Sequence, residues 1–285
     1  MDFLIIVSGL LILNITQNLS MIQHDGWYLK LSSWLSEAFG RNVWVYLATL
    51  LLPVIGLMLL EAVVSSKMFG LTGYFLGLFV LLYAFGRGDL DADVELYKHD
   101  LARQDLQAAY HDTVPFNTAH HESKAVDWPQ LHEEALANIG YRYFEHYFVV
   151  LFWFILAGPA GALLYRLAQL HCDDEMDRGR IAAAARRFLW LMEWVPVRIL
   201  GFTLAIVGNF ASCLKPLLES LVDFSASSAL TISRLVSGAL DIEYTDGDQT
   251  DAENTAVLEV SGVQSLFHRA MIAVVCMVGL FVIFT

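Results

Sequence analysis

The sequence has little charge and few cysteines. Only 16% of its 285 residues are charged, whereas 56% are hydrophobic, and the mean hydropathy is +0.52. A chain of this length with these values is too apolar to be an ordinary soluble protein. The three cysteines are scattered in or beside apolar segments, so neither a disulfide framework nor a zinc motif is expected. The composition therefore predicts an integral membrane protein whose helices contact the lipid bilayer.

Basic residues are also scarce, with 17 lysines and arginines against 30 aspartates and glutamates. Because a nucleic-acid-binding surface is basic, nucleic acid is not an expected partner. The acids gather in the polar segments, and residues 87–146 alone hold twelve of them together with six histidines. Several of these histidines stand directly beside an acid, and neighbouring positions point to different faces of a helix. No metal site is therefore predicted, and the region is expected to present a solvated acidic surface.

Apolar residues recur at helical intervals in two parts of this polar region. Such a period predicts amphipathic helices with one buried face each. The first face consists of Leu90, Val94, Tyr97 and Leu101, and the second of Leu131, Ala135, Ile139 and Tyr143.

Residues 147–165 carry no charge and are long enough to approach the thickness of a hydrocarbon core. Gly158, Pro159 and Gly161 interrupt this segment. Pro159 lacks a backbone N–H and crowds the carbonyl one turn earlier, so the helix must kink or break here. Two alternatives stay open: a kinked spanning helix whose glycines admit a neighbouring helix, or a broken, re-entrant helix that lines a polar site.

The predicted fold is an all-α integral membrane protein with about four to six membrane helices, one of them kinked or re-entrant, and amphipathic helices in the polar loops. Gly70, Gly73 and Gly77 form a small-residue stripe on one apolar segment, a pattern typical of a helix-packing face. We expect five segments along the chain. They are N-terminal transmembrane helices (1–86), an acidic helical region (87–146), a broken membrane segment with a basic amphipathic helix and the WVPVR apolar segment (147–214), an amphipathic helix with an acidic linker (215–267), and a C-terminal transmembrane helix (268–285).

Three motifs carry a resemblance to a known family. They are FVVLFWF at 148–154, GPAGALLYRL at 158–167 and EWVPVR at 193–198. Together they resemble the AmpE family of Gram-negative bacteria. The resemblance implies a multi-pass protein of the bacterial inner membrane that has a regulatory or signalling part in the induction of chromosomal β-lactamase. It also implies a link to cell-wall recycling, because such proteins are encoded next to an amidase that recycles muropeptides.

The same motifs are similar to those of the CobD/CbiB membrane synthase, which forms an amide bond at the expense of ATP. Tyr141 to Phe144 and Gln169 to Cys172 stand where that relative has acidic and amide residues. A synthase needs carboxylates to hold Mg²⁺ against phosphates, so a non-enzymatic regulator is the favoured hypothesis. It has no catalytic residues, metal or cofactor. The alternatives are an ATP- and Mg²⁺-dependent synthase and a module that packs against a partner's transmembrane helix through the glycine stripe.

Charged and amide residues near the segment ends are the candidates for a ligand site. Arg166 directly follows the break around Pro159, and we expect it either to reach the lipid headgroups or to be buried against the break, with Glu193 or the carbonyls freed by Pro159 as acceptors. The full set of candidate ligand-binding residues is Arg87, Asp89, Asn138, Arg142, Arg166, Glu193 and Arg198.

Overall fold

The computed structural model is built of helices, and within its described residues there is no β-strand. The described residues are 2–16, 23–65, 70–103, 105–116, 128–173, 180–240 and 249–284. Four helical stretches in this part of the chain are long and apolar enough to cross a membrane: Val43–Val63, Trp128–Cys172, Ile181–Val207 and Thr255–Val282. Three shorter apolar helices accompany them. The expected all-α membrane fold is confirmed.

The contacts divide the chain into two compact units, each assembled from separate stretches of sequence. Unit 1 comprises residues 1–88 and 146–193, and unit 2 comprises residues 89–145 and 194–285. The five segments expected from the sequence were continuous stretches, whereas both units are discontinuous. The chain passes from one unit to the other at Gly88/Asp89, Glu145/His146 and Glu193/Trp194.

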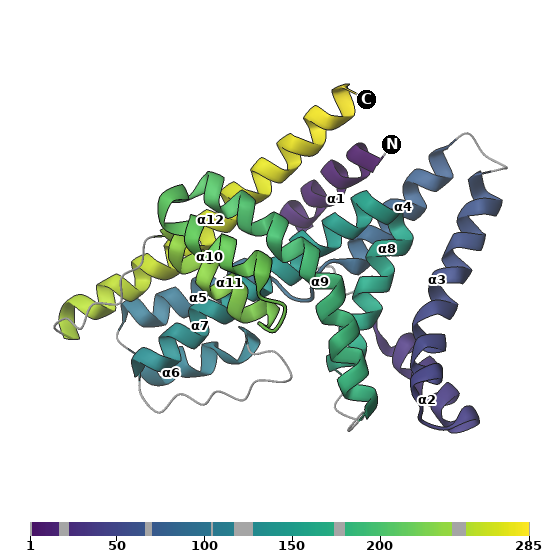
Figure 1. Cartoon of the computed structure of the whole chain (residues 1–285), viewed down its shortest axis with the longest axis horizontal. Helices are drawn as coiled ribbons and strands as arrows, with labels where there is room; N and C mark the ends of the chain where they lie inside the picture. Colours follow the sequence, from purple (N-terminus) through teal and green to yellow (C-terminus); the bar gives the residue numbers. More distant parts are fainter. Residues whose placement is uncertain are drawn as a thin grey trace. The chain divides into compact units, whose positions relative to one another are not determined.

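Unit 1 is built around the helix that carries the break. It contains α1 (Asp2–Thr16), α2 (Gly26–Phe39), α3 (Val43–Ser65), α4 (Leu71–Ala84), α8 (Val149–Asp173) and the first part of α9 (Arg180–Val207). Both α3 and α4 pack against α8, and α1 packs against α4 (Figure 1). A Cβ atom at Gly77 would lie 3.0 Å from Ile5 Cδ1 and 3.5 Å from Pro159 Cγ. The absence of a side chain at Gly77 therefore lets α1 and α8 approach α4.

The other two glycines of the stripe have different surroundings. Gly70 precedes α4 as its N-cap residue with a φ of 68°. A Cβ atom at Gly73 would meet no atom within 4 Å. Among the described residues, Gly77 is thus the position of the stripe at which other helices approach closely.

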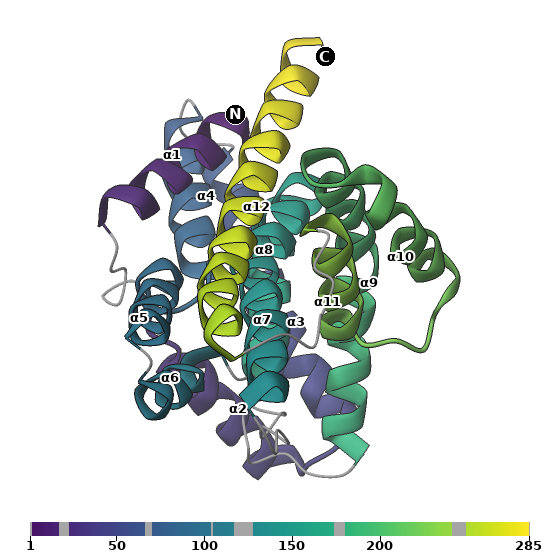
Figure 2. The same cartoon turned by 90° about the vertical axis from the view of Figure 1, so that its left-hand side faces the viewer.

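Unit 2 contains the polar helices and the C-terminal helix. Its elements are α5 (Leu90–Ala102), α6 (Leu106–Asp112), the short η1 (Val114–Phe116), α7 (Trp128–Tyr143), the second part of α9, α10 (Phe210–Val222), α11 (Ser228–Leu240) and α12 (Gln249–Phe284). The helix α11 packs against α7 and α10, and α12 lies along α5 and α7 (Figure 2). All eight residues predicted for the inner faces of α5 and α7 are buried, which confirms both faces.

Two parts of the C-terminal region differ from expectation. Within residues 147–214, the basic amphipathic helix and the WVPVR apolar segment were expected as separate elements, but a single helix, α9, runs without interruption from Arg180 to Val207 through Pro196. One amphipathic helix was expected at the start of the segment 215–267, over residues 215–240. They belong to two helices, because the chain turns at Asp223, whose Oδ1 accepts hydrogen bonds from the backbone N–H groups of Ser225 and Ala226 at 2.8 and 3.2 Å. The link at 117–127 and the linker residues 241–248 lie outside the described residues.

The break in α8 lies at Gly158, where φ is 66° and ψ is −161°. This conformation is essentially restricted to glycine. Pro159 then occupies the first position of the second helical half, where its missing N–H and fixed φ are tolerated. The predicted interruption is confirmed. Gly161 has a different role, since a Cβ atom there would lie 2.6 Å from the backbone oxygen of Trp153.

We predict that Gly158→Ala destabilises the protein by about 1–3 kcal/mol, because an alanine must adopt a backbone conformation that L-residues avoid. A Cβ atom at this position would meet no other atom within 4 Å, so crowding adds nothing to this effect. The measurement is the melting temperature of the purified chain in detergent. Gly73→Ala is the matched control, because it is helical and open, and there alanine gains roughly 0.8–1 kcal/mol of helix propensity. Equal melting temperatures for Gly158→Ala and the wild type would show that the break is not strained.

Candidate functional site

Three segments of unit 1 meet at the carboxylate of Asp25. Asp25 precedes α2, Arg87 follows α4, and Arg166 lies in the second half of α8. Arg87 Nε donates to Asp25 Oδ2 at 2.8 Å, and Arg87 Nη2 forms a second, short bond to Oδ1. Arg166 Nη2 approaches Asp25 Oδ2 at 3.4 Å. One carboxylate is thereby shared by two guanidinium groups. We call these three residues the Asp25 cluster.

Neighbouring polar groups hold the Asp25 cluster in place. The Tyr83 hydroxyl donates to Asp25 Oδ1 at 3.0 Å, and the Trp27 indole N–H donates to the Tyr83 oxygen at 3.1 Å. Arg166 Nη1 donates to Gln169 Oε1 at 2.7 Å, one helical turn further along α8. The cluster therefore connects α2, α4 and α8 through side chains alone.

The electrostatics of the Asp25 cluster follow from burial and from the two positive charges. Burial by itself raises the pKa of Asp25, but the hydrogen bond from Arg87 and the charges of Arg166 and Arg87 bring this pKa below its usual value. Asp25 is thus ionised at neutral pH. Arg166 is only 3% exposed, so its side chain is buried among other groups of the protein. Its acceptors include Gln169 and Asp25. Glu193 accepts a hydrogen bond from the Tyr165 hydroxyl at 3.2 Å.

Sequence reasoning missed Asp25, although it found both arginines. Asp25 is the one carboxylate in residues 3–36, and it stands two residues before Trp27 in a segment rich in aromatic residues. A single acid in such surroundings is a signal, because an isolated charge beside apolar residues needs a partner. Nothing in the local sequence identifies that partner, since Arg166 lies 141 residues away.

Asp89 and Arg142 contact groups of their own unit. Asp89 is the N-cap of α5 and accepts from the backbone N–H of Ala92 at 3.1 Å. Arg142 pairs with Glu145 and donates from Nε to the Phe116 carbonyl at 3.3 Å. Asn138 is half-buried on α7. Of the seven candidates, the structure brings Arg87 and Arg166 to a common partner.

Arg198 closes the C-terminal end of α10. Its guanidinium donates to the carbonyls of Trp194, Ser220 and Asp223 at 2.8, 2.7 and 3.1 Å. The same group lies 4.0 Å from the centre of the Trp194 ring. A planar donor fork suits this task, because it satisfies carbonyls that the end of a helix leaves without partners.

Several polar contacts in unit 2 join α12 to α5 and α7. Asp91 accepts from His268 Nε2 at 3.1 Å and from Gln264 at 3.3 Å, and it also bonds to the Tyr143 hydroxyl. Burial raises the pKa of Asp91, but hydrogen bonds from His268 and Tyr143 lower it to about 2.

His132, expected on a solvated surface, is instead buried between Tyr97 at 3.1 Å and Glu259 at 3.0 Å. Among the described residues, no group of three His, Cys, Asp or Glu side chains is arranged to hold a metal ion.

Comparison with known proteins gives one family and one relative. The family model described as "Regulatory signalling modulator protein AmpE" matches residues 5–285. The chain is also similar to Protein AmpE of Shigella flexneri, with 24% identity over 193 residues that cover 64% of this chain and 66% of the relative. The aligned part is thus slightly less than two thirds of that relative's length. No solved structure matches the chain.

We predict that Arg166→Lys lowers the melting temperature, because an ammonium group lacks the planar fork that reaches both Gln169 and Asp25. Arg166→Ala should cost about 1–3 kcal/mol by leaving buried acceptors unpaired. The control is Arg234→Lys, since Arg234 is half-exposed and lies 4.0 Å from Asp223. Thermal unfolding in detergent gives all three values. An Arg166→Lys variant as stable as the wild type would contradict the assigned role of the guanidinium.

Because Arg166 shares the Asp25 carboxylate with Arg87, a double substitution tests the ionic contact separately. In an Asp25→Asn background, Arg166→Lys should lose less stability than in the wild type, because its ionic partner is already gone. Additive effects of the two substitutions would show that Arg166 is held by other groups.

Proposed function

We propose, from the premise that the chain belongs to the AmpE family of regulatory signalling modulator proteins, that it regulates the induction of a chromosomal β-lactamase from the bacterial inner membrane. The chain is a regulatory membrane protein with four helical stretches suited to crossing a bilayer. We propose that the chain crosses the inner membrane several times and that its action is linked to β-lactamase induction and to cell-wall recycling. We also propose that it acts without catalysis.

The observation that carries the non-enzymatic role is the internal pairing of the candidate arginines. Arg87 and Arg166 bind Asp25, Arg142 binds Glu145, and Arg198 binds three backbone carbonyls. A phosphate-transferring enzyme keeps its cationic groups available for the substrate. Here, turning Arg166 toward a substrate would separate its buried guanidinium from Gln169 and from the part-buried carboxylate of Asp25. These arginines are therefore better suited to holding the fold than to catalysis.

The synthase alternative has less support. It requires carboxylates that hold Mg²⁺ against ATP, and Asp89 is one of the two carboxylates among the candidate ligand-binding residues. That side chain caps α5 through the Ala92 N–H. The two matches above support the regulatory alternative and neither supports the synthase, so we propose that the protein works without ATP or Mg²⁺.

A membrane regulator contacts lipid and transmits its state to a partner. Large apolar side chains are exposed along the spanning helices, including Leu52 and Leu59 of α3 and Ile272 and Phe281 of α12. We propose that a membrane-protein partner contacts α4 on the glycine face formed by Gly70, Gly73 and Gly77. Because Gly77 is already covered by Ile5 and Pro159, the part available to a partner helix is at Gly73.

We predict that the chain alters β-lactamase induction in a Gram-negative host that has an inducible enzyme and lacks its own member of the family. Gly73→Leu should abolish this effect, because a large side chain blocks close approach of a partner helix. The measurement is β-lactamase activity with and without inducer, normalised to membrane-protein level. Gly56→Leu is the matched control, since Gly56 is another open helical glycine, in α3. Equal induction with and without the chain would refute the regulatory assignment.

We further predict that Mg²⁺ and ATP leave the melting temperature of the purified protein unchanged. The contrary result would be Mg²⁺-dependent stabilisation by ATP that Asp89→Ala abolishes. Asp89→Ala also removes a helix cap worth about 1 kcal/mol. We therefore compare, for each variant, the change in melting temperature that ATP causes. Asp105→Ala is the control, because Asp105 caps α6 through the Ala108 N–H in the same way.

A further inference from the structure

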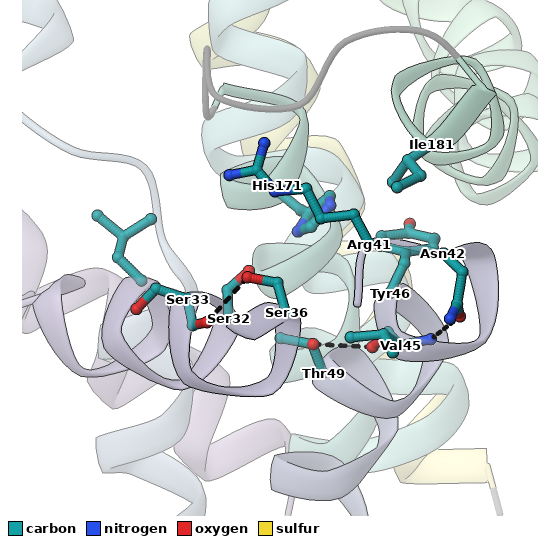
Figure 3. A pocket seen from close by; sticks show the side chains of 11 residues that line it. Ser32, Ser33, Ser36, Arg41, Asn42, Val45, Tyr46, Thr49, His171 and Ile181 are labelled. Carbon is teal, nitrogen blue, oxygen red and sulfur yellow. Dashed lines mark hydrogen bonds between the residues drawn. The ribbon is translucent and has the colours of Figure 1, made fainter. Parts of the chain in front are cut away.

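A small hollow lies in unit 1 where α2, the start of α3 and the end of α8 meet (Figure 3). Its volume is about 60 Å³. A single water needs roughly 10–15 Å³ on this measure, so the hollow has room for only a few non-hydrogen atoms. That is the size of one phosphate or carboxylate group, whereas sites for drug-sized ligands occupy roughly 300–1,000 Å³.

The polar lining of the hollow consists of groups that can donate hydrogen bonds. It includes the side chains of Ser32, Arg41, Asn42, Tyr46 and His171. Figure 3 shows the Arg41 side chain extending toward His171 across the hollow. Although the chain has 30 acidic residues, no aspartate or glutamate is among the residues that line it. The hollow is thus suited to an anion.

Asn42, which directly precedes α3, also makes the hollow suited to an anion. Its Oδ1 accepts the backbone N–H of Val45 at 3.0 Å in the first turn of α3, which leaves the side-chain NH₂ group as a donor. The N-terminal end of a helix carries a partial positive charge and unpaired N–H groups, so it favours an anion. The N-terminal end of α3 and the Arg41 guanidinium therefore both favour an anion in the hollow.

The Tyr46 hydroxyl provides independent evidence for a ligand. Tyr46 is 3% exposed, and its oxygen is buried without a hydrogen-bond partner. Leaving such a group unpaired costs about 1–3 kcal/mol, and buried polar groups in proteins almost always have a partner. The ring contacts His171 and Phe188, with centroid distances of 4.5 and 6.5 Å, which hold it in position.

We propose that this hollow binds one phosphate group, supplied by the headgroup of an anionic membrane lipid. The location supports a lipid source, because the hollow is at the start of the spanning stretch Val43–Val63. The exposed aromatic residues Trp34, Phe39 and Trp44 surround that point in the sequence. Tryptophan at such a boundary is typical of headgroup depth. The proposal stands apart from the regulatory function, since the hollow uses neither the Asp25 cluster nor the glycine face.

The decisive substitution is Tyr46→Phe, which removes one oxygen and leaves the net charge unchanged. If the hydroxyl binds a phosphate, this change should weaken binding roughly 10- to 100-fold, because a hydrogen bond to a charged group is stronger than one between neutral groups. If the hollow has no ligand, removing an unpaired buried hydroxyl should leave stability unchanged or raise it.

The experiment measures thermal unfolding of the full chain in phosphatidylcholine nanodiscs, with and without phosphatidylglycerol, and again with inorganic phosphate. We expect phosphatidylglycerol to raise the melting temperature of the wild type, and Tyr46→Phe and Arg41→Gln to lose this shift. Lys30→Gln is the control for general surface charge, because Lys30 lies on α2 outside the lining. It should keep the shift.

Inorganic phosphate distinguishes the two sources of the ligand. Stabilisation by inorganic phosphate alone, lost in the same two variants, would support the phosphate site and assign it to a soluble ligand. Equal shifts in the wild type and Tyr46→Phe, or no shift with either probe, would overturn the proposal. If Arg41→Gln does not fold, Tyr46→Phe decides by itself.

Discussion

The sharing of Asp25 by Arg87 and Arg166 is the contact on which the arrangement of unit 1 depends. Moving a single charged group away from water costs several kcal/mol, and only good geometry with opposite charges offsets that cost. Arg166 can reach Asp25 only if the second half of α8 has the right direction, and the break at Gly158 sets this direction. The glycine and proline motif therefore has a purpose beyond helix packing. It places a buried guanidinium where α2 and α4 can meet it.

The candidate residues found in the sequence lie mostly where the chain passes between the two units. Arg87 and Asp89 are on either side of the first passage, Arg142 pairs with Glu145 just before the second, and Glu193 ends unit 1 at the third. In each case the side chain anchors the backbone within its own unit. Charged residues next to apolar segments resemble ligand-binding residues in sequence, because both tasks require a polar group near the membrane. Their contacts indicate anchoring, while binding of a ligand by them stays a prediction.

Local chemistry explains which parts of the fold could be predicted. Proline and glycine act on their own backbone, so the break in α8 was visible in the sequence, and the helical period of apolar residues identified the buried faces of α5 and α7. Contacts between distant segments leave no such periodic signal. Asp25 was missed for this reason, and so was the Glu259 partner of His132, which is 127 residues away. The turn at Asp223 was missed because its side chain caps a connection that apolar spacing does not record.

The helix α12 has a part that makes polar contacts with other helices of unit 2 and an end with exposed apolar side chains. Glu259 contacts α7 and His268, near the middle of the helix, contacts α5, while Met277, Phe281 and other apolar side chains of the last turns are exposed. A continuous helix is stiff because every turn is bonded to the next. The polar contacts within unit 2 therefore fix the direction of α12 and of the apolar end that follows His268. If the His132–Glu259 and Asp91–His268 contacts were removed, α12 could change its direction relative to α5 and α7, while its apolar C-terminal end would stay the same.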